Sequence, residues 1–291
     1  MQYLTNENID RKKWDNAISN AVNNDIFGYS WFLDIICQNW DAIIDDDYKN
    51  VLPITIINKN FVLNPPFVFW TGIFCNELLS QSKIVDFFNA IPNSFKTVNI
   101  ALNKICDINN VENGRINQKK MMQIDLIQPF EKREFHIKTS DYKTFSINIK
   151  QTLAFFIVNN FVLGLGKYAK LINELIQRGK CMVFATTDLE RKILATAVVF
   201  ISNNSLFISS VCIDKKSDNE ILRAKLLDSI IEYFSGKNFV LYSKIDNENA
   251  YEGFDSKTLI NAGAEEYYYP FFIRNTFSIK TLFSKINKFG T

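Results

Sequence analysis

The sequence predicts an α/β protein built from two tandem halves, each holding a sheet flanked by helices. Two observations lead to this prediction. Apolar residues recur at helical spacing in some segments, and in others they fill short runs bounded by polar turns. The resulting order (two helices, three strands, a helix, a strand and a closing strand) occurs twice. A hydrophobic fraction of 47% over 291 residues is sufficient for a real core.

The first half begins with two predicted helices. Apolar residues from Trp14 to Val22 stand at helical spacing, and Ser30 is expected to cap the second helix, over 30–40. The remaining elements of this half are expected to be strands over 40–45, 48–58 and 61–74, a helix over 77–91, and strands over 96–102 and 119–126.

The second half repeats this order. Its second helix is expected to end at Gly179, since glycine favours the position after a helix. The predicted elements are helices over 146–155 and 166–179, strands over 180–188, 192–202 and 205–213, a helix over 217–235, a strand over 239–245, a helix over 252–263 and a strand over 265–273.

Composition excludes several classes of protein. With 33 basic and 31 acidic residues the net charge is +2, so we expect no strong bulk attraction to DNA or to an anionic membrane. The five cysteines are widely spaced, with no CxxC pair and no zinc spacing, which predicts free thiols, no metal and a reducing cytoplasm. No segment has the length of a membrane span or the pattern of a signal peptide.

Several stretches carry a resemblance to a known family. "YSWFLDIICQNWDAIIDDDYKNVLPI" followed by "NPPFVFWTGIF" resembles the N-terminal half of FemAB-like proteins, a branch of the GNAT acyltransferase superfamily. "MMQIDL" leading to "YKTFSINIKQTLAF" is similar to the start of their second half, and "AGAEEYYYPFFI" resembles their closing segment. The resemblance implies two tandem GNAT-like domains, 1–130 and 131–291, each a mixed, mostly antiparallel sheet flanked by helices.

The resemblance also implies an activity. A FemAB-like acyltransferase moves an acyl or aminoacyl group from a thioester or ester donor to an amine acceptor, here in a groove between the two halves. The donor enters between two splayed parallel strands, 205–213 and 239–245 in this sequence, and acyl-CoA is the donor expected of GNAT enzymes. The implied donor-binding residues are Val211, Cys212, Ile213, Lys215, Ser217, Arg223 and Tyr242.

The loop before helix 217–235, "DKKSDN", departs from the family pattern because it contains no glycine. Ser217 and Glu220 form a predicted capping box, which favours a plain crossover over a pyrophosphate cradle. Arg223 falls within the apolar stripe of the helix, so it either extends past the core into water or meets an anion, with Lys215 as a further contact for a phosphate.

Two residues are candidates for proton transfer. Asp246 matches the position of a carboxylate in FemAB-like relatives, where it accepts a proton from the amine; the alternative is a carboxylate that caps its own loop. Tyr269 matches the tyrosine that protonates the leaving group in GNAT enzymes, with ordinary packing as the alternative. Strand alternation places Tyr267 and Tyr269 on one face and Tyr268 on the other.

The acceptor groove is expected to be lined by aromatic side chains, with core packing as the alternative reading. Proline cannot donate to a strand ladder, so "NPPFVFW" must be an edge, a bulge or the rim of a groove. The single histidine, His136, is interpreted as structural. The candidate groove residues are Trp31, Tyr48, Phe67 and Trp70.

Two other classes of function compete with the acyltransferase. The missing glycine signature favours a catalytically silent GNAT-fold binding or scaffold protein. The third candidate is an aminoacyl-tRNA-dependent transferase acting on a peptidoglycan precursor, and the near-neutral charge and the lack of room for a coiled-coil arm disfavour a tRNA partner. The expected partner is otherwise a small-molecule or peptide-like amine.

Overall fold

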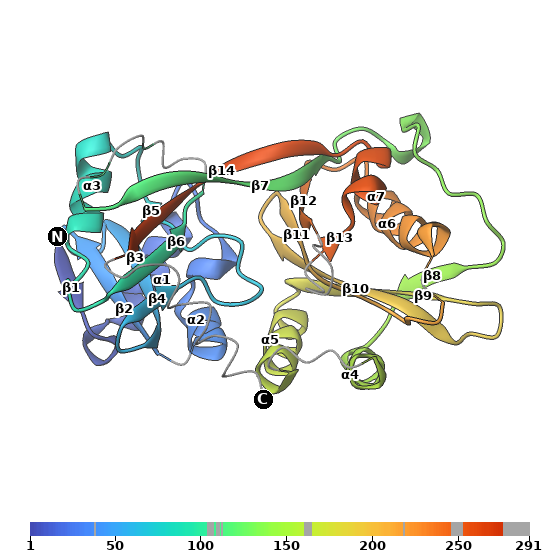
Figure 1. Ribbon diagram of the computed structural model, residues 1–291, viewed down its shortest axis with the longest axis horizontal. Coiled ribbons are helices and arrows are strands. Elements are labelled where there is room, and N and C mark those ends of the chain that lie inside the picture. The colour runs from blue at the N-terminus through green and yellow to red at the C-terminus, as the bar shows by residue number, and fades with distance from the viewer. Residues whose placement is uncertain are drawn as a thin grey trace. The chain divides into compact units, whose positions relative to one another are not determined.

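A computed structural model describes residues 1–37, 39–103, 108, 111, 113–159, 165–217, 219–245 and 253–275. The chain forms two compact units (Figure 1). The first consists of Met1–Lys119 with Tyr268–Thr291, and the second of Lys120–Tyr267. The chain passes from one unit to the other within strand β7 (Arg115–Asp125) and returns within β14 (Glu265–Asn275).

The first unit holds a mixed sheet in the order β1-β2-β3-β4-β6-β14. Every neighbouring pair is antiparallel except β4 and β6, which are parallel. A further short strand, β5 (Phe74–Cys75), pairs with β3. The strands of the ordered row are β1 (Gln2–Leu4), β2 (Asn39–Asp45), β3 (Asn50–Asn58), β4 (Phe61–Leu63) and β6 (Thr97–Ala101), closed by residues 271–275 of β14.

Three helices accompany this sheet, α1 (Arg11–Asn20), α2 (Ser30–Ile36) and α3 (Gln81–Asn89). Asp10 caps α1, where its carboxylate accepts hydrogen bonds from the first-turn amides, and the predicted apolar stripe is buried through Trp14 and Ile18. Helix α3 contributes Ile84, Phe87 and Phe88 to a core shared with β2, β3, β4 and β6.

The second unit repeats the same pairing in the order β8-β9-β10-β11-β12-β7. Only β11 and β12 are parallel within that row, at the position that β4 and β6 hold in the first unit. This two-fold similarity confirms the predicted fold class. The strands are β8 (Lys143–Ser146), β9 (Cys181–Thr187), β10 (Ile193–Ser202), β11 (Ser205–Ile213) and β12 (Val240–Ile245), and β13 (Gly253–Phe254) pairs with the end of β12.

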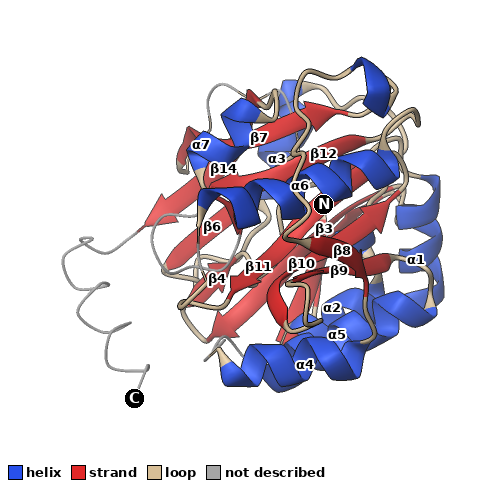
Figure 2. Cartoon of the chain, turned by 90° about the vertical axis from the view of Figure 1, so that its right-hand side faces the viewer, coloured by secondary structure: helices blue, strands red, loops and turns tan. Residues whose placement is uncertain are grey.

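Helices cover both faces of the second sheet (Figure 2). Helix α6 (Glu220–Phe234) lies on one face, and α4 (Ile149–Val158) and α5 (Leu165–Gln177) lie on the other. The apolar stripe of α6, with Leu222, Leu226 and Ile230, packs on β10 and β11, and α7 (Ser256–Asn261) adds Leu259 to the same core. The central strands β9, β10 and β11 are buried on both faces, which explains their nearly continuous apolar sequences.

Several expectations about local structure were wrong. The single strand expected over 61–74 is two short strands, β4 and β5, because Pro65 and Pro66 cannot continue a ladder and Phe67 adopts a left-handed backbone (φ 66°). Ser30 does not cap α2: the capping position is Tyr29, and the Ser30 amide and hydroxyl both donate to the Asp15 carboxylate.

The thiol prediction is confirmed for the cysteines that the structure describes. Cys37, Cys75, Cys181 and Cys212 are buried thiols, and Cys106 lies outside the described residues. Within the described ranges, no helix is long and apolar enough to cross a membrane. The same part of the chain holds no cluster of three or more residues suited to a metal ion.

Candidate functional site

The parallel pair β11 and β12 separates part-way along its length. Ladder pairing runs from Ser205 and Val240 to Ile208 and Ser243, and then stops. Strand β11 continues to Ile213 while β12 pairs instead with β13, through Lys244 and Ile245. Among the described residues, 209–213 therefore have no ladder partner on β12, and their backbone groups on that edge need another partner.

The separation starts where β11 carries a β-bulge. Val199 of β10 pairs with Ile208 and Val198 with Ser210, so Ser209 is the extra residue. The bulge turns the two consecutive serines toward the same tyrosine of α5. The Tyr168 hydroxyl donates to Ser209 Oγ at 3.0 Å and lies 2.7 Å from Ser210 Oγ, and all three side chains are buried. Sequence analysis missed this cluster.

The three donor-binding residues predicted at the end of β11 are buried. Val211 and Ile213 point into the core beneath α6, and Cys212 is fully enclosed. Burial raises the pKa of the Cys212 thiol to about 12, with a further contribution from the charge of Asp214. Cys212 is therefore an inert thiol at neutral pH. Any contact of this segment with a ligand would come from its main chain.

The loop that follows β11 is closed upon itself by Asp214. Its carboxylate accepts hydrogen bonds from the Lys216 amide at 3.2 Å and the Ser217 hydroxyl at 3.2 Å, and its carbonyl oxygen accepts one from the Ser217 amide at 2.9 Å. The Lys216 amide and the Lys192 ammonium, 3.3 Å away, hold the pKa of Asp214 below its ordinary value. Two amides of the loop, those of Lys216 and Ser217, are thus already bonded and are not available to a phosphate.

The predicted capping box was wrong. Asn219, not Ser217, caps α6, and its side chain accepts a hydrogen bond from the Leu222 amide at 2.8 Å. Glu220 does not reach back to the cap but pairs with Lys257 at 2.7 Å. The physical reason is the turn built by Asp214, which engages Ser217 and delays the start of the helix.

Arg223 meets an anion from the protein itself. Its guanidinium lies 3.5 Å from the carboxylate of Asp255, which also caps α7 by accepting a hydrogen bond from the Thr258 amide at 2.9 Å. Of the two alternatives left open for Arg223, extension into water or contact with an anion, the structure shows the second, within the second unit. Lys215, the other phosphate candidate, is exposed in the turn.

The tyrosine candidates lie on several elements. Tyr242 of β12 stacks on Phe207 of β11 with ring centres 5.5 Å apart, and its ring edge meets Tyr267 at 5.2 Å. Tyr267 and Tyr269 are buried while Tyr268 is half exposed, as strand alternation predicted. Tyr269 belongs to the first unit. Asp246, the predicted base, lies outside the described residues.

Three of the four predicted groove aromatics are buried in the first unit. The Tyr48 hydroxyl accepts a hydrogen bond from the Asp10 amide at 2.9 Å, and the Trp70 indole donates to Asp25 at 3.2 Å. Phe67 is 3% exposed. Trp31, which stacks against Tyr29 with ring centres 6.2 Å apart, is the one with accessible surface.

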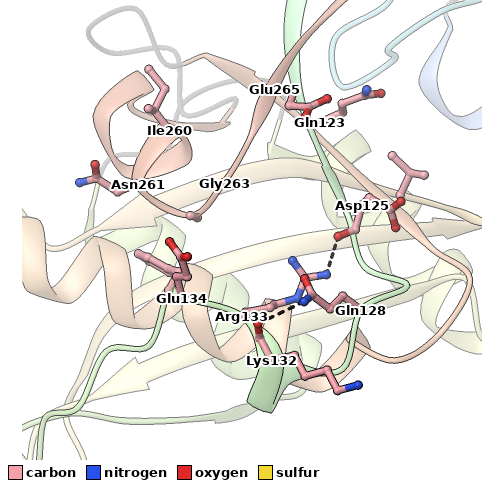
Figure 3. A pocket seen from close by; sticks show the side chains of 13 residues that line it. Gln123, Asp125, Gln128, Lys132, Arg133, Glu134, Ile260, Asn261, Gly263 and Glu265 are labelled. Carbon is pink, nitrogen blue, oxygen red and sulfur yellow. Dashed lines mark hydrogen bonds between the residues drawn. The ribbon is translucent and has the colours of Figure 1, made fainter.

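The second unit also contains a pocket that sequence analysis did not predict, with a volume of about 690 Å³ (Figure 3). Its residues come from the end of β7, the segment that follows it, the start of β12, and the turn between α7 and β14. Charged and amide side chains dominate the lining. They are Gln123, Asp125, Gln128, Lys132, Arg133, Glu134, Asn261 and Glu265, with Phe135, Val240, Ile260, Ala262 and Gly263 as the remainder.

Comparison with known proteins identifies the fold. No protein-family model matches the chain, and no curated protein matches its sequence. Among solved structures, L-PGS from Bacillus licheniformis superposes with a TM-score of 0.54 at 11% identity, over 96% of each chain. FemX superposes with a TM-score of 0.53 at 8% identity, over 98% of this chain and 100% of that chain. The protein has a FemAB-like GNAT fold.

The separated strands occupy the position that the resemblance to this fold predicted. The strands expected from the resemblance, 205–213 and 239–245, correspond to β11 and β12, and they are the parallel pair of the second GNAT-like unit. The predicted splay is present, because their ladder ends at Ile208 and Ser243. The identities of 8% and 11% carry the likeness of fold and no residue role.

Proposed function

We propose that the protein is an acyltransferase that moves an acyl or aminoacyl group from a thioester or ester donor to an amine acceptor. The observation that carries the proposal is the separation of β11 from β12 at Ile208 and Ser243. Among the described residues, it leaves main-chain groups of 209–213 without ladder partners on the β12 side only. A donor carbonyl that accepts a hydrogen bond from an amide on this edge becomes more electrophilic. The negative charge that develops on this oxygen in the tetrahedral intermediate would be stabilised by the same main-chain amides.

The closed loop at Asp214 bears on which donor is used. A pyrophosphate bound at the start of α6 would meet amides that already donate to Asp214 and would lie beside its negative charge. Arg223, a half-buried cation in the first turn of the helix, already faces Asp255. In this proposal an acyl-CoA held by its pyrophosphate is disfavoured, and an acyl or aminoacyl ester held mainly by its acyl end is favoured.

The proposal assigns proton transfer to two residues. Asp246, which follows β12 in sequence, accepts the proton of the attacking amine, and Tyr269 donates one to the departing oxygen or sulfur. The bond from nitrogen to the acyl carbon forms as the bond to the ester or thioester breaks, so the step needs no other reactant. Contact with the acceptor is assigned to Trp31, because Tyr48, Phe67 and Trp70 are buried in the first unit.

The competing function is a GNAT-fold protein that binds without catalysis, and the internally bonded loop specifically favours it. Thermal-shift measurements can separate the two functions. Acetyl-CoA, and a non-hydrolysable amide analogue of the aminoacylated 3′ end of tRNA, are added to the whole protein. A ligand at 100 times its Kd stabilises the folded state by about 2.7 kcal/mol.

The proposal predicts stabilisation by the aminoacyl analogue and little by acetyl-CoA. Transfer to a panel of amines should then be detected by mass spectrometry. Asp246→Asn should abolish turnover while leaving the melting temperature unchanged. If neither donor class binds and no amine is acylated, the acyltransferase proposal is wrong and the binding function is preferred.

A further inference from the structure

Arg133 lies at the pocket of the second unit as a partly buried cation. Its Nε donates to Ser235 Oγ at 3.0 Å and its Nη2 donates to the main-chain oxygen of Asp125. Partial burial lowers the pKa of the Arg133 guanidinium, although the nearby charge of Asp125 opposes this. Among the described residues, no acidic side chain forms an ion pair with it. A guanidinium in this setting is stabilised by an added anion.

The same pocket carries acidic groups without an ion pair among the described residues. Glu134 and Glu265 line it, and within the described part of the chain neither forms an ion pair. Asp125, the third acid, accepts a hydrogen bond from the Ile127 amide at 2.8 Å. With Lys132 the lining holds two cations and three anions, so it offers partners for both signs of charge.

The geometry of the lining sets one carboxylate, that of Glu265, apart from the Arg133 guanidinium, whereas Asp125 lies beside it. Figure 3 shows the Arg133 guanidinium directed toward Asp125, while Glu265, the first residue of β14, lies beside Gln123, and Asn261, the last residue of α7, lies across the pocket. We propose that this pocket binds a small zwitterion of the amino-acid class, with its carboxylate on Arg133 and its ammonium among the acidic side chains. Its volume of about 690 Å³ accommodates a free amino acid or a short peptide with free ends.

The uncharged part of the lining fits the same ligand class. Gln123, Gln128 and Asn261 carry amides that can both donate to and accept from a main-chain-like group. Ile260 and Phe135 supply apolar surface for a side chain. An inorganic anion or a simple amine would use only half of these groups.

The pocket is distinct from the separated strands. Val240, which lines it, is the first residue of β12, whereas β12 leaves β11 after Ser243. Three residues of extended chain put these points roughly 10 Å apart along the strand. Binding at the pocket therefore does not depend on the proposed acyl transfer.

The test is calorimetric titration of the whole protein with L-alanine, L-lysine and L-alanyl-L-alanine, each beside its N-acetylated and its C-amidated form. At least one zwitterion should bind, and blocking either of its charged ends should weaken its affinity by about tenfold or more. The probe that binds most tightly shows whether the ligand is a free amino acid or a short peptide. Amide shifts in ¹⁵N NMR should move at Gln123, Gly263 and Glu265 and not at 209–213.

Two variants and a matched control make the test specific. Arg133→Gln retains a side chain that can bond Ser235 but removes the charge, and Glu265→Gln changes an exposed group. Each should weaken binding by about tenfold or more. Arg178→Gln, directly after α5 and paired with Glu174, should bind like the wild type. Failure of every zwitterion to bind at about 10 mM, equal binding of the blocked forms, or unchanged binding in both variants would overturn the proposal.

Discussion

The hydroxyl of Tyr168 offers a direct measure of how the bulge in β11 is held. Tyr168→Phe removes one oxygen from a site where Tyr168, Ser209 and Ser210 are all buried. Two hydrogen bonds are lost, at 3.0 Å and 2.7 Å, and at least one serine hydroxyl is left without its partner. A buried hydroxyl left unpaired costs about 1–3 kcal/mol, so we expect a loss of about 2 kcal/mol in the free energy of unfolding.

The assay is urea unfolding followed by circular dichroism, with the midpoint and slope fitted for each variant. Tyr233→Phe is the matched control, because Tyr233 is half exposed on α6, and its effect should stay within about 0.5 kcal/mol. In the double variant Tyr168→Phe with Ser210→Ala, both partners become apolar. The second substitution should then cost less than it does alone, with a coupling energy of about 0.5–3 kcal/mol.

Two results would refute this reasoning. The first is a Tyr168→Phe protein as stable as the control. The second is a double variant whose loss equals the sum of the single losses, because independent sites add. Either result would mean that the three hydroxyls do not stabilise the bulge, and that the course of β11 is determined by its ladder with β10 alone.

Three further predictions address other parts of the second unit. Gly253→Ala should destabilise by about 1–3 kcal/mol or more, measured by urea unfolding, because the new Cβ would lie 1.9 Å from the carbonyl oxygen of Lys244; a neutral effect would show that β13 moves freely. Burial raises the pKa of Asp228, so its contribution to stability is complete below the unfolded pKa of about 3.9 and is lost as the pH rises through the folded pKa. Relative to wild type, Asp228→Asn should therefore gain stability between pH 4 and pH 7, and a constant difference across that range would contradict this. Asn219→Ala should cost about 0.5–2 kcal/mol by removing the cap of α6 and should exceed the loss caused by Ser217→Ala; the reverse order would restore the original capping prediction.

The main strands and helices of both halves could be predicted because their sequences encode their burial. Strand 205–213 was predicted with its observed bounds, since an apolar run between polar turns has few other structures open to it. Strands β1 and β8 were not predicted, because three and four residues of mixed polarity carry no period. The segment 64–73 is as apolar as a strand, and only its prolines signalled otherwise.

The site was harder to predict because its features depend on register and on distant segments. The bulge at Ser209 follows from how β11 aligns with β10, which local sequence does not encode. The pairing of Arg223 with Asp255 joins two helices, and the pocket joins residues near 125 to others near 262. The turn at Asp214 had a local signal in the sequence. An aspartate commonly accepts hydrogen bonds from the residues two and three positions later, as Asp214 does from Lys216 and Ser217.

The exchange of strands between the two units bears on how the chain folds as it leaves the ribosome. Strand β6 ends at Ala101, but its antiparallel neighbour is residues 271–275, which are synthesised much later. At about 5–20 residues per second, the edge of β6 stays uncovered for on the order of ten seconds or more. During that interval its free backbone groups can pair with another nascent chain on the same messenger. The second unit has no such interval, since its borrowed strand, β7, is synthesised before the rest of its sheet. Crowded polysomes therefore place the heavier demand for chaperones on the half of the protein that is made first.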